Sequence, residues 1–267
     1  MTAGYYGLAG DPFSRQFNKQ ANCFQSADYR QASARLGHLK DTRGIGVMTA
    51  APGLGKSLTL RYFSEGLNQN LFKPVYISLS TVTVVEFYRQ LCAELGIEGA
   101  YGKAAQVKAI KGQIEYMYKE KRQTLVLSLD EAQYLCHDIL KDLKMLTNFN
   151  YDSMCCFALV LCGEPHLRDI LKRPAHEALR QRIVVNYDFA GLQDSEVKDY
   201  VLHKIRCAAG AETIIDGSAI TALHGLAQGN PRVIDNLMSD ALVIGGQLRK
   251  QVIDAEVIMA AADNRAL

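Results

Sequence analysis

The residues with the clearest chemical potential form a short glycine-rich segment. Residues 50–57 read Ala-Ala-Pro-Gly-Leu-Gly-Lys-Ser and follow an apolar run. In a loop of this type, backbone N–H groups surround phosphates, a lysine reaches the β and γ phosphates, and a serine hydroxyl binds Mg²⁺. We therefore predict that this loop binds ATP, with Ser57 as a metal ligand. The predicted nucleotide-binding residues are Pro52, Gly53, Leu54, Gly55, Lys56, Ser57 and Leu58.

The loop departs from the usual pattern at its first position, where Ala50 replaces a glycine. A methyl group is tolerated there if the backbone φ is negative. The alternative interpretation is a glycine-rich turn between a strand and a helix that binds nothing. The Gly-Lys-Ser sequence, in register with both predicted elements, favours the phosphate loop.

Two carboxylates end a second apolar run. Residues 125–129 read Leu-Val-Leu-Ser-Leu and are followed by Asp130 and Glu131. In a P-loop ATPase the aspartate orients the Mg²⁺ shell and the glutamate polarises the attacking water. Taken alone, Asp130 could instead cap a short helix. The spacing from the loop fits two strand–helix units, so we predict Asp130 as a metal ligand and Glu131, with Lys56, as catalytic.

Strands must alternate with helices to bring these two segments to one edge of a sheet. Short apolar or β-branched runs predict strands over 45–49, 74–79, 124–129, 156–161 and 184–189. Helical spacing predicts helices over 27–39, 58–67, 84–95, 104–121 and 139–148. This alternation predicts an α/β fold with a parallel sheet flanked by helices.

The pattern changes after about residue 191. Helices are predicted over 194–207, 218–227, 231–245 and 254–262, and no strand of comparable quality follows. We therefore expect two domains: a nucleotide-binding α/β domain over 1–190 and an all-helical domain over 191–267. ATP and Mg²⁺ would bind between them.

The composition excludes several classes of protein. The 267 residues are 48% hydrophobic and 22% charged, as in ordinary globular proteins, which excludes a disordered tail or a collagen-like repeat. The net charge is only +2, so any nucleic-acid surface must be local. The seven cysteines lack zinc spacing and are expected to be reduced thiols. With no signal peptide and no apolar run of membrane length, we expect a soluble, cytoplasmic protein with no membrane partner.

Further motifs point to one family. They are Tyr-Tyr-Gly-Leu at 5–8, Asp-Pro-Phe at 11–13, Leu-Cys-Gly-Glu-Pro-His-Leu at 161–167, Leu-Arg-Gln-Arg-Ile at 179–183 and Gly-Asn-Pro-Arg at 229–232. Together with the phosphate loop and the acidic pair, these motifs resemble the AAA+ ATPases of the ExeA-like group. That group includes the transposition-helper ATPases of the TniB, TnsC, MuB and IstB types. The resemblance covers nearly the whole chain.

The resemblance implies an AAA+ P-loop NTPase with a C-terminal helical lid that hydrolyses ATP to ADP and phosphate. It also implies that Arg182, or as second choice Arg180, reaches the γ-phosphate bound by a neighbouring subunit. Arg232 matches the arginine of the sensor-2 motif, which lies in the helical lid of the family, and would bind nucleotide. A cation near the start of a predicted helix opposes the helix dipole, which favours this role over a surface ion pair. In AAA+ proteins the sensor-1 residue is a polar residue that ends the fourth strand. It is not assigned here, because that place, residues 162–164, reads Cys-Gly-Glu.

A local excess of basic residues lies within 102–122, which carries six Lys or Arg against two Glu, with tyrosines interleaved. In filament-forming relatives this region tracks the DNA backbone, so the resemblance implies largely sequence-independent contact with duplex DNA. The alternative is a solvated helix face with Lys–Glu pairs. The candidate DNA-binding residues are Lys103, which is the first choice because it follows Gly102 and precedes the predicted helix, and Thr81, Lys108 and Lys111.

The resemblance thus predicts a homo-oligomer, a ring or a helical filament, that assembles on duplex DNA with ATP and recruits or activates a transposase. Hydrolysis would disassemble it, and a targeting factor could be a further partner. Two alternatives stay open: a secretion-associated ATPase of the ExeA type, and a nucleotide switch without turnover, which Glu131 disfavours. An initiator-type or clamp-loader-like ATPase is a third, for which no additional DNA-binding domain is evident.

Overall fold

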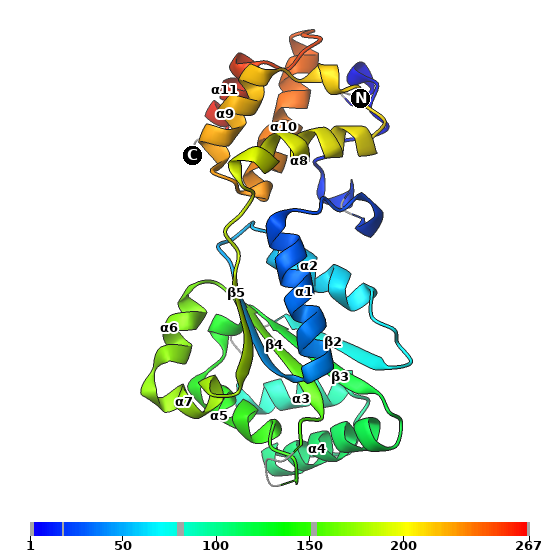
Figure 1. Cartoon of the computed structure of the whole chain (residues 1–267), viewed down its shortest axis with the longest axis vertical. Coiled ribbons are helices and arrows are strands. Elements are labelled where there is room, and N and C mark those ends of the chain that lie inside the picture. The colour runs from blue at the N-terminus through cyan, green and yellow to red at the C-terminus, as the bar shows by residue number, and fades with distance from the viewer. Residues whose placement is uncertain (1–2, 18, 79–82, 151–153, 266–267) are drawn as a thin grey trace. The chain divides into compact units, whose positions relative to one another are not determined.

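The structure, a computed structural model, describes residues 3–17, 19–78, 83–150 and 154–265 (Figure 1). Contacts divide the chain into two compact units. The α/β unit comprises Gln31–Pro52 and Lys56–Phe189. The helical unit comprises the N-terminal segment up to Arg30, the loop tip Gly53–Gly55, and the chain from Ala190 onwards.

The α/β unit is built on five parallel strands in the order β2-β3-β4-β1-β5. They are β1 (Gly44–Thr49), β2 (Phe72–Ser78), β3 (Thr124–Asp130), β4 (Phe157–Gly163) and β5 (Ile183–Asp188). Strands β3 and β4 are buried along their whole length, as expected of inner strands covered on both faces. This is why both appear in the sequence as continuous apolar runs.

The strand register brings the chemistry to one edge of the sheet. Thr49, the last residue of β1, pairs with Gly163, the last residue of β4. Leu129 of β3 pairs with Leu161 of β4, so Asp130 comes to the same edge. Because all strands run parallel, the loops that follow β1, β3 and β4 leave the sheet together. Ligands of open α/β sheets bind at this carboxyl edge.

Helices cover the sheet (Figure 1). They are α1 (Ala27–Thr42), α2 (Lys56–Glu65), α3 (Val84–Glu94), α4 (Lys103–Lys119), α5 (His137–Leu146), α6 (His166–Lys172) and α7 (Glu177–Arg180). A capping box between Thr83 and Glu86 starts α3. α1 packs closely on β1, because a Cβ added to Gly46 would lie 2.6 Å from Leu39 Cδ2.

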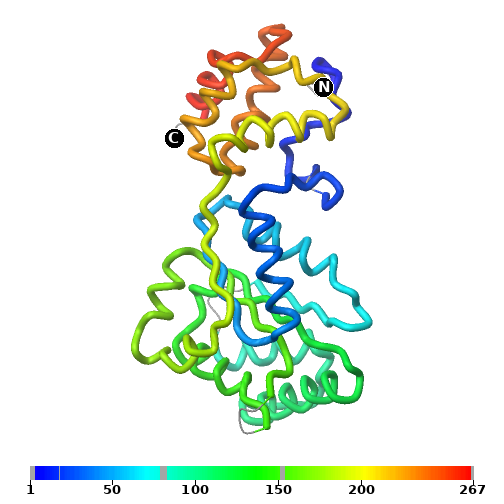
Figure 2. The backbone as a smooth tube through the Cα atoms, in the orientation of Figure 1, coloured from blue at the N-terminus to red at the C-terminus, as the bar shows by residue number. Residues whose placement is uncertain are grey.

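The helical unit contains α8 (Asp194–Cys207), α9 (Gly217–Ala227), α10 (Pro231–Gln247) and α11 (Ala255–Asp263). The N-terminal segment lies beside these helices (Figure 2) and contributes Tyr6, Leu8 and Phe13 to their core. The Tyr6 hydroxyl donates to the Lys250 carbonyl at 3.0 Å. The N-terminal segment therefore groups with the C-terminal helices, whereas the sequence analysis assigned it to the nucleotide-binding domain.

A buried ion pair lies beside Phe13 in that core. Lys204 and Asp235 form an ion pair at 2.8 Å, and the Tyr200 hydroxyl donates to Asp235 at 2.7 Å. The Lys204 ammonium also lies over the Phe13 ring. Burial raises the pKa of Asp235, although Lys204 opposes that rise. A paired and hydrogen-bonded carboxylate is the arrangement that makes such burial tolerable.

The sequence-based prediction of a parallel α/β sheet flanked by helices is confirmed, and each predicted strand and helix is present in the described residues. Helices α6 and α7, which are short, were not predicted. None of the seven cysteines, all of which lie in the described part, forms a disulfide. No helix within the described ranges has the length and apolar character needed to cross a membrane.

Candidate nucleotide-binding site

The predicted phosphate loop connects β1 to α2. Gly53 and Gly55 both have φ of 93°, in the region that favours glycine. An added Cβ on Gly53 would lie 2.5 Å from Asn230 Oδ1 and 2.8 Å from Arg232 Cβ, and all three residues belong to the helical unit. The first N–H groups of α2 have no partner within the helix, so its start can bind phosphate oxygens.

The other residues predicted to contact the nucleotide differ in exposure. Lys56 is buried and is the first residue of α2. Pro52 is exposed, whereas Leu54 and Leu58 are half-buried. These exposures are compatible with a loop that presents its backbone, but their contact with nucleotide stays a prediction.

Lys56 lies between the two predicted acidic residues. Its Nζ is 3.3 Å from Asp130 Oδ1 and 3.5 Å from Glu131 Oε1. Burial by itself would lower the pKa of Lys56, but nearby negative charge, chiefly that of Asp130, outweighs it and raises the pKa. The side chain therefore carries a firm positive charge at the edge of the sheet, as phosphate binding requires.

Asp130 is almost fully buried and has several hydrogen-bond donors around it. The Ser57 hydroxyl donates to Oδ2 at 2.7 Å, and the Tyr76 hydroxyl donates to the same oxygen at 2.8 Å. Burial would raise the pKa of Asp130, but the Ser57 hydrogen bond and the Lys56 charge outweigh it and hold the pKa below its usual value. Asp130 does not cap the short helix η4 (Ala132–Tyr134), whose N-cap is Glu131.

Glu131 has an unusual backbone for a residue with a side chain. Its φ of 56° and ψ of 37° lie in the left-handed region, which costs about 1–3 kcal/mol for a residue other than glycine. Its carboxylate is partly exposed, with Oε1 near Lys56 and Oε2 accepting from Gln133 Nε2 at 2.7 Å. Strain of this kind is often retained at functional sites, which fits the predicted catalytic role.

Two residues of the site were missed by the sequence analysis, namely Tyr76 and Gln133. Tyr76 lies on β2, whose register places it two residues before the partner of Asp130. Burial, followed by the hydrogen bond to Asp130, raises the pKa of Tyr76, so the hydroxyl stays protonated and donates. A tyrosine between the two buried aliphatic residues Val75 and Ile77 of β2 is the signal that could have identified it.

The place expected for sensor 1 holds Cys162, which is fully buried at the end of β4. Burial raises the pKa of its thiol well above the usual value, so the thiol is neutral. The next residue, Gly163, approaches the Gln133 side chain, because an added Cβ would lie 2.5 Å from Gln133 Oε1. The end of β4 therefore contacts the acidic segment through a glutamine.

The two predicted trans-acting arginines differ in exposure. Arg182 is half-buried and donates from Nη1 to Thr147 Oγ1 at 3.1 Å. Arg180 is exposed on α7 and donates to the Lys172 carbonyl at 2.9 Å. These two hydrogen bonds orient the guanidinium groups.

The predicted sensor-2 residue, Arg232, is exposed at the second position of α10. Asn230 caps this helix, and its Oδ1 accepts from the Arg232 backbone N–H at 3.0 Å. The cap fixes the start of α10. A Cβ added to Gly53 would lie 2.8 Å from the Arg232 Cβ, so the Arg232 side chain leaves the backbone close to the Gly53 tip of the phosphate loop. Its contact with nucleotide is still a prediction.

The predicted DNA-binding lysines are not equally available. Lys103 forms an ion pair with Asp142 at 2.6 Å. Lys111 donates to the Asn148 backbone carbonyl at 2.7 Å and so supplies a hydrogen-bond donor to the segment that follows α5. Lys108 is exposed on α4 between them. Thr81 lies outside the described residues.

The oxygens of Ser57 and Asp130 fit Mg²⁺, which prefers one or two protein oxygens together with substrate phosphates. Among the described residues there is no group of three or more His, Cys, Asp or Glu side chains placed to hold a metal ion. A magnesium ion at this edge would therefore depend on the nucleotide for most of its ligands.

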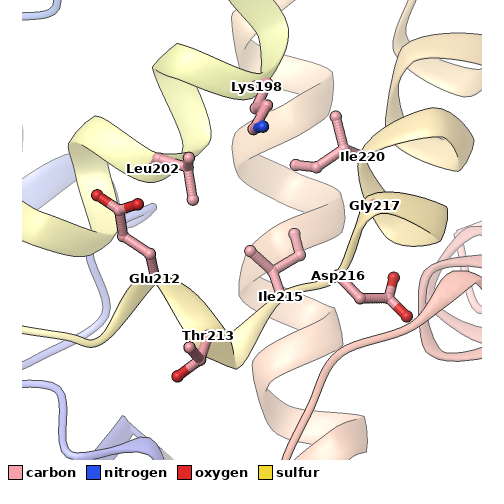
Figure 3. Close-up of a pocket in the computed structure, with 8 residues that line it drawn as sticks. All are labelled: Lys198, Leu202, Glu212, Thr213, Ile215, Asp216, Gly217 and Ile220. Carbon is pink, nitrogen blue, oxygen red and sulfur yellow. The ribbon is translucent and has the colours of Figure 1, made fainter.

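A separate cavity of about 440 Å³ lies in the helical unit (Figure 3). Leu202, Ile215 and Ile220 form its apolar lining. Of its two acidic residues, Glu212 pairs with Arg206 and Asp216 caps α9. Both carboxylates thus have structural roles, and we assign no chemistry to this cavity.

The chain is similar in sequence to a known protein family and to a curated protein. Residues 39–171, which span the phosphate loop and the acidic pair, match a protein family described as an AAA domain. The chain is 28% identical over 268 residues to General secretion pathway protein A of Aeromonas hydrophila. This alignment covers 98% of the chain and 48% of that protein, so the chain spans about half the length of the curated relative it matches.

Two solved structures have a similar fold. Cdc6p from Pyrobaculum aerophilum superposes with a TM-score of 0.71 at 18% identity, covering 95% of this chain and 70% of that chain. Drosophila ORC bound to DNA gives a TM-score of 0.71 at 16% identity, covering 98% of this chain and 66% of that chain. This chain therefore has an AAA+ P-loop NTPase fold, as the sequence analysis predicted.

Proposed function

We propose that this protein is a Mg²⁺-dependent ATPase that assembles on duplex DNA and recruits or activates a transposase. The observation that carries the ATPase assignment is the convergence of four side chains at the carboxyl edge of the sheet. Lys56 contacts both Asp130 and Glu131, and Ser57 donates to Asp130. A lysine, a hydroxyl and two carboxylates in this arrangement suit phosphate binding, metal binding and water activation.

Each of these side chains has one task in the proposed reaction. Lys56 would exchange its carboxylate contacts for the β and γ phosphates of ATP. Ser57 and Asp130 would hold Mg²⁺, which neutralises charge on the phosphates when bound. Glu131 would accept a hydrogen bond from the attacking water and orient it toward the γ-phosphate.

Assembly is proposed to complete the site. Arg182, with Arg180 as the second choice, would reach the γ-phosphate held by a neighbouring copy, and Arg232 would contact the nucleotide bound by its own chain. ATP would therefore favour the oligomer, and hydrolysis would weaken it. A targeting factor as a further partner and a cytoplasmic location also belong to this proposal.

The DNA part of the proposal rests on α4 and the basic segment around it. Lys108 is its best single candidate, since Lys103 and Lys111 already have partners within the chain. Two tyrosines in this region are exposed: Tyr116 lies on α4, and Tyr101 lies just before it. A protein that shares this fold, Drosophila ORC, is bound to DNA in its structure.

Replacing Lys108 by alanine is expected to weaken duplex binding and to lower its salt dependence. One lost phosphate contact reduces the slope of log K against log salt by about 0.9. We would measure binding to a random-sequence duplex between low and moderate salt, with a slowly hydrolysed ATP analogue. Lys103→Ala serves as the comparison, because the Lys103 ammonium is held by Asp142. Equal slopes for Lys108→Ala and the unaltered protein would remove α4 from the DNA surface.

A second candidate function is favoured by one observation. The 28% identity to General secretion pathway protein A extends over nearly the whole chain. An ATPase of that kind would bind ATP without binding DNA and would act with a membrane partner. Absence of duplex binding in the experiment above, with ATP turnover intact, would favour this candidate over the transposition proposal.

A further inference from the structure

Gln133 makes two hydrogen bonds in opposite directions. Its Nε2 donates to Glu131 Oε2 at 2.7 Å, and its Oε1 accepts from the Glu164 backbone N–H at 3.1 Å. A primary amide supplies a donor and an acceptor at one end of a side chain, so both contacts can be made at once. The Glu164 N–H fixes which way the amide points, because a reversed amide would place a donor against a donor.

The end of β4 is shaped to receive this amide. Gly163 is the residue just before Glu164, and a Cβ added there would lie 2.5 Å from Gln133 Oε1. Such a separation is far below van der Waals contact, so a side chain at Gly163 would displace the amide. Gly163 is also the last residue of β4, directly after Cys162. The contact therefore joins Glu131 to the strand end where a polar sensor was expected.

Glu131 needs such a contact once ATP is bound. Within the described part of the chain, its carboxylate contacts Lys56 at 3.5 Å and Gln133 at 2.7 Å. In the proposed reaction Lys56 moves its contacts to the phosphates, which leaves Gln133 to fix the carboxylate. A general base must point at its water in a defined direction, and a misplacement of about 1 Å can reduce the rate about 100-fold.

We propose that Gln133 is the positioning residue for Glu131, and that it ties the direction of the catalytic carboxylate to the end of β4. This inference rests on the proposed ATP hydrolysis. Gln133 would touch neither ATP nor water. It would act by holding one oxygen of Glu131, with Gly163 leaving the room that the amide requires.

Two substitutions separate positioning from simple support of the fold. Gln133→Glu keeps the oxygen that accepts from Glu164 but presents a carboxylate to Glu131, whereas Gln133→Met removes both hydrogen bonds at similar volume. We expect both to lower kcat for ATP by about 10- to 100-fold, with KM and the affinity for a slowly hydrolysed analogue within about 2-fold. A role limited to supporting the β4 end predicts that Gln133→Glu retains its kcat.

A double-substitution experiment tests the role of Gly163. Gly163→Ala should lower kcat as Gln133→Met does, and the pair together should be no worse than either alone, since both substitutions remove the same restraint of the Gln133 amide on Glu131. Multiplied losses in the pair, or an unchanged kcat in both Gln133 variants, would overturn the proposal. Phosphate release by the unaltered protein is measured alongside, with and without duplex DNA. If it is absent while ATP binds, the proposed function fails as well. If it is present and the Gln133 variants match it, only the positioning role fails.

Discussion

Glu131→Gln is expected to lower ATP turnover by about 10²- to 10⁴-fold, the range in which a general base contributes to catalysis. The amide has the same size as the carboxylate but cannot accept a proton from water. ATP binding should persist, because Lys56 and the phosphate loop are unchanged and Lys56 loses a carboxylate that competes for it. Phosphate release and the affinity for ATP, measured on the same sample, give the two quantities.

The matched control for this substitution is Glu94→Gln, which makes the same chemical change at an exposed position near the end of α3. Its turnover should equal that of the unaltered protein. Glu131→Gln with unimpaired turnover would contradict the base assignment. Lack of turnover in the unaltered protein, with ATP bound, would instead support a nucleotide switch.

Arg182→Ala is expected to lower turnover by about 10³-fold or more, the effect of an arginine that stabilises the transferring phosphate from a neighbouring subunit. The Arg182 guanidinium donates to the Thr147 hydroxyl, which orients the side chain, and a guanidinium keeps its charge at any pH the protein meets. The affinity of a single chain for ATP should change little, since the arginine would act on the site of another copy. Arg180→Ala is the parallel variant, because Arg180 is more exposed but lies only two residues away.

Mixing tests whether the arginine acts between subunits. A Lys56→Ala chain lacks its own phosphate-binding lysine but still supplies Arg182 to a neighbour. In an equal mixture with Arg182→Ala, about one quarter of the interfaces would combine an intact loop with an intact arginine. Activity should therefore reappear when the two inactive proteins are mixed. Mixtures that stay inactive would place the function of Arg182 within its own chain.

Much of the fold could be predicted from the sequence because its signals are local. The apolar runs of β3 and β4 reflect strands buried on both faces, and the helices between strands follow the usual spacing. The helices α6 and α7 are too short to show such a period. The grouping of the N-terminal segment with the C-terminal helices was not predicted for a different reason: Phe13 packs against helices far away along the chain, which periodicity does not reveal.

The candidate site divides in the same way. Lys56, Ser57, Asp130 and Glu131 lie in short motifs whose spacing carries their chemistry, and the structure brings all four together. Tyr76 escaped notice because its role depends on the register between β2 and β3.

Side-chain direction explains the remaining differences. Gln133 could not be assigned because its role depends on where the amide points and on the missing Cβ of Gly163. The lysines of α4 show the converse, since their charges suggested a DNA surface. Lys103 and Lys111 in fact have partners within the chain, while Lys108 is exposed. Charge is visible in a sequence, but its pairing depends on the folded neighbours.

The most direct test of the proposed function is particle size by negative-stain electron microscopy. The protein would be imaged with Mg²⁺ and a slowly hydrolysed ATP analogue, with and without duplex DNA. The proposal predicts rings or filaments that require both the nucleotide and the DNA. Assemblies that form with nucleotide but are indifferent to DNA would contradict the DNA-directed function and favour the secretion-type ATPase.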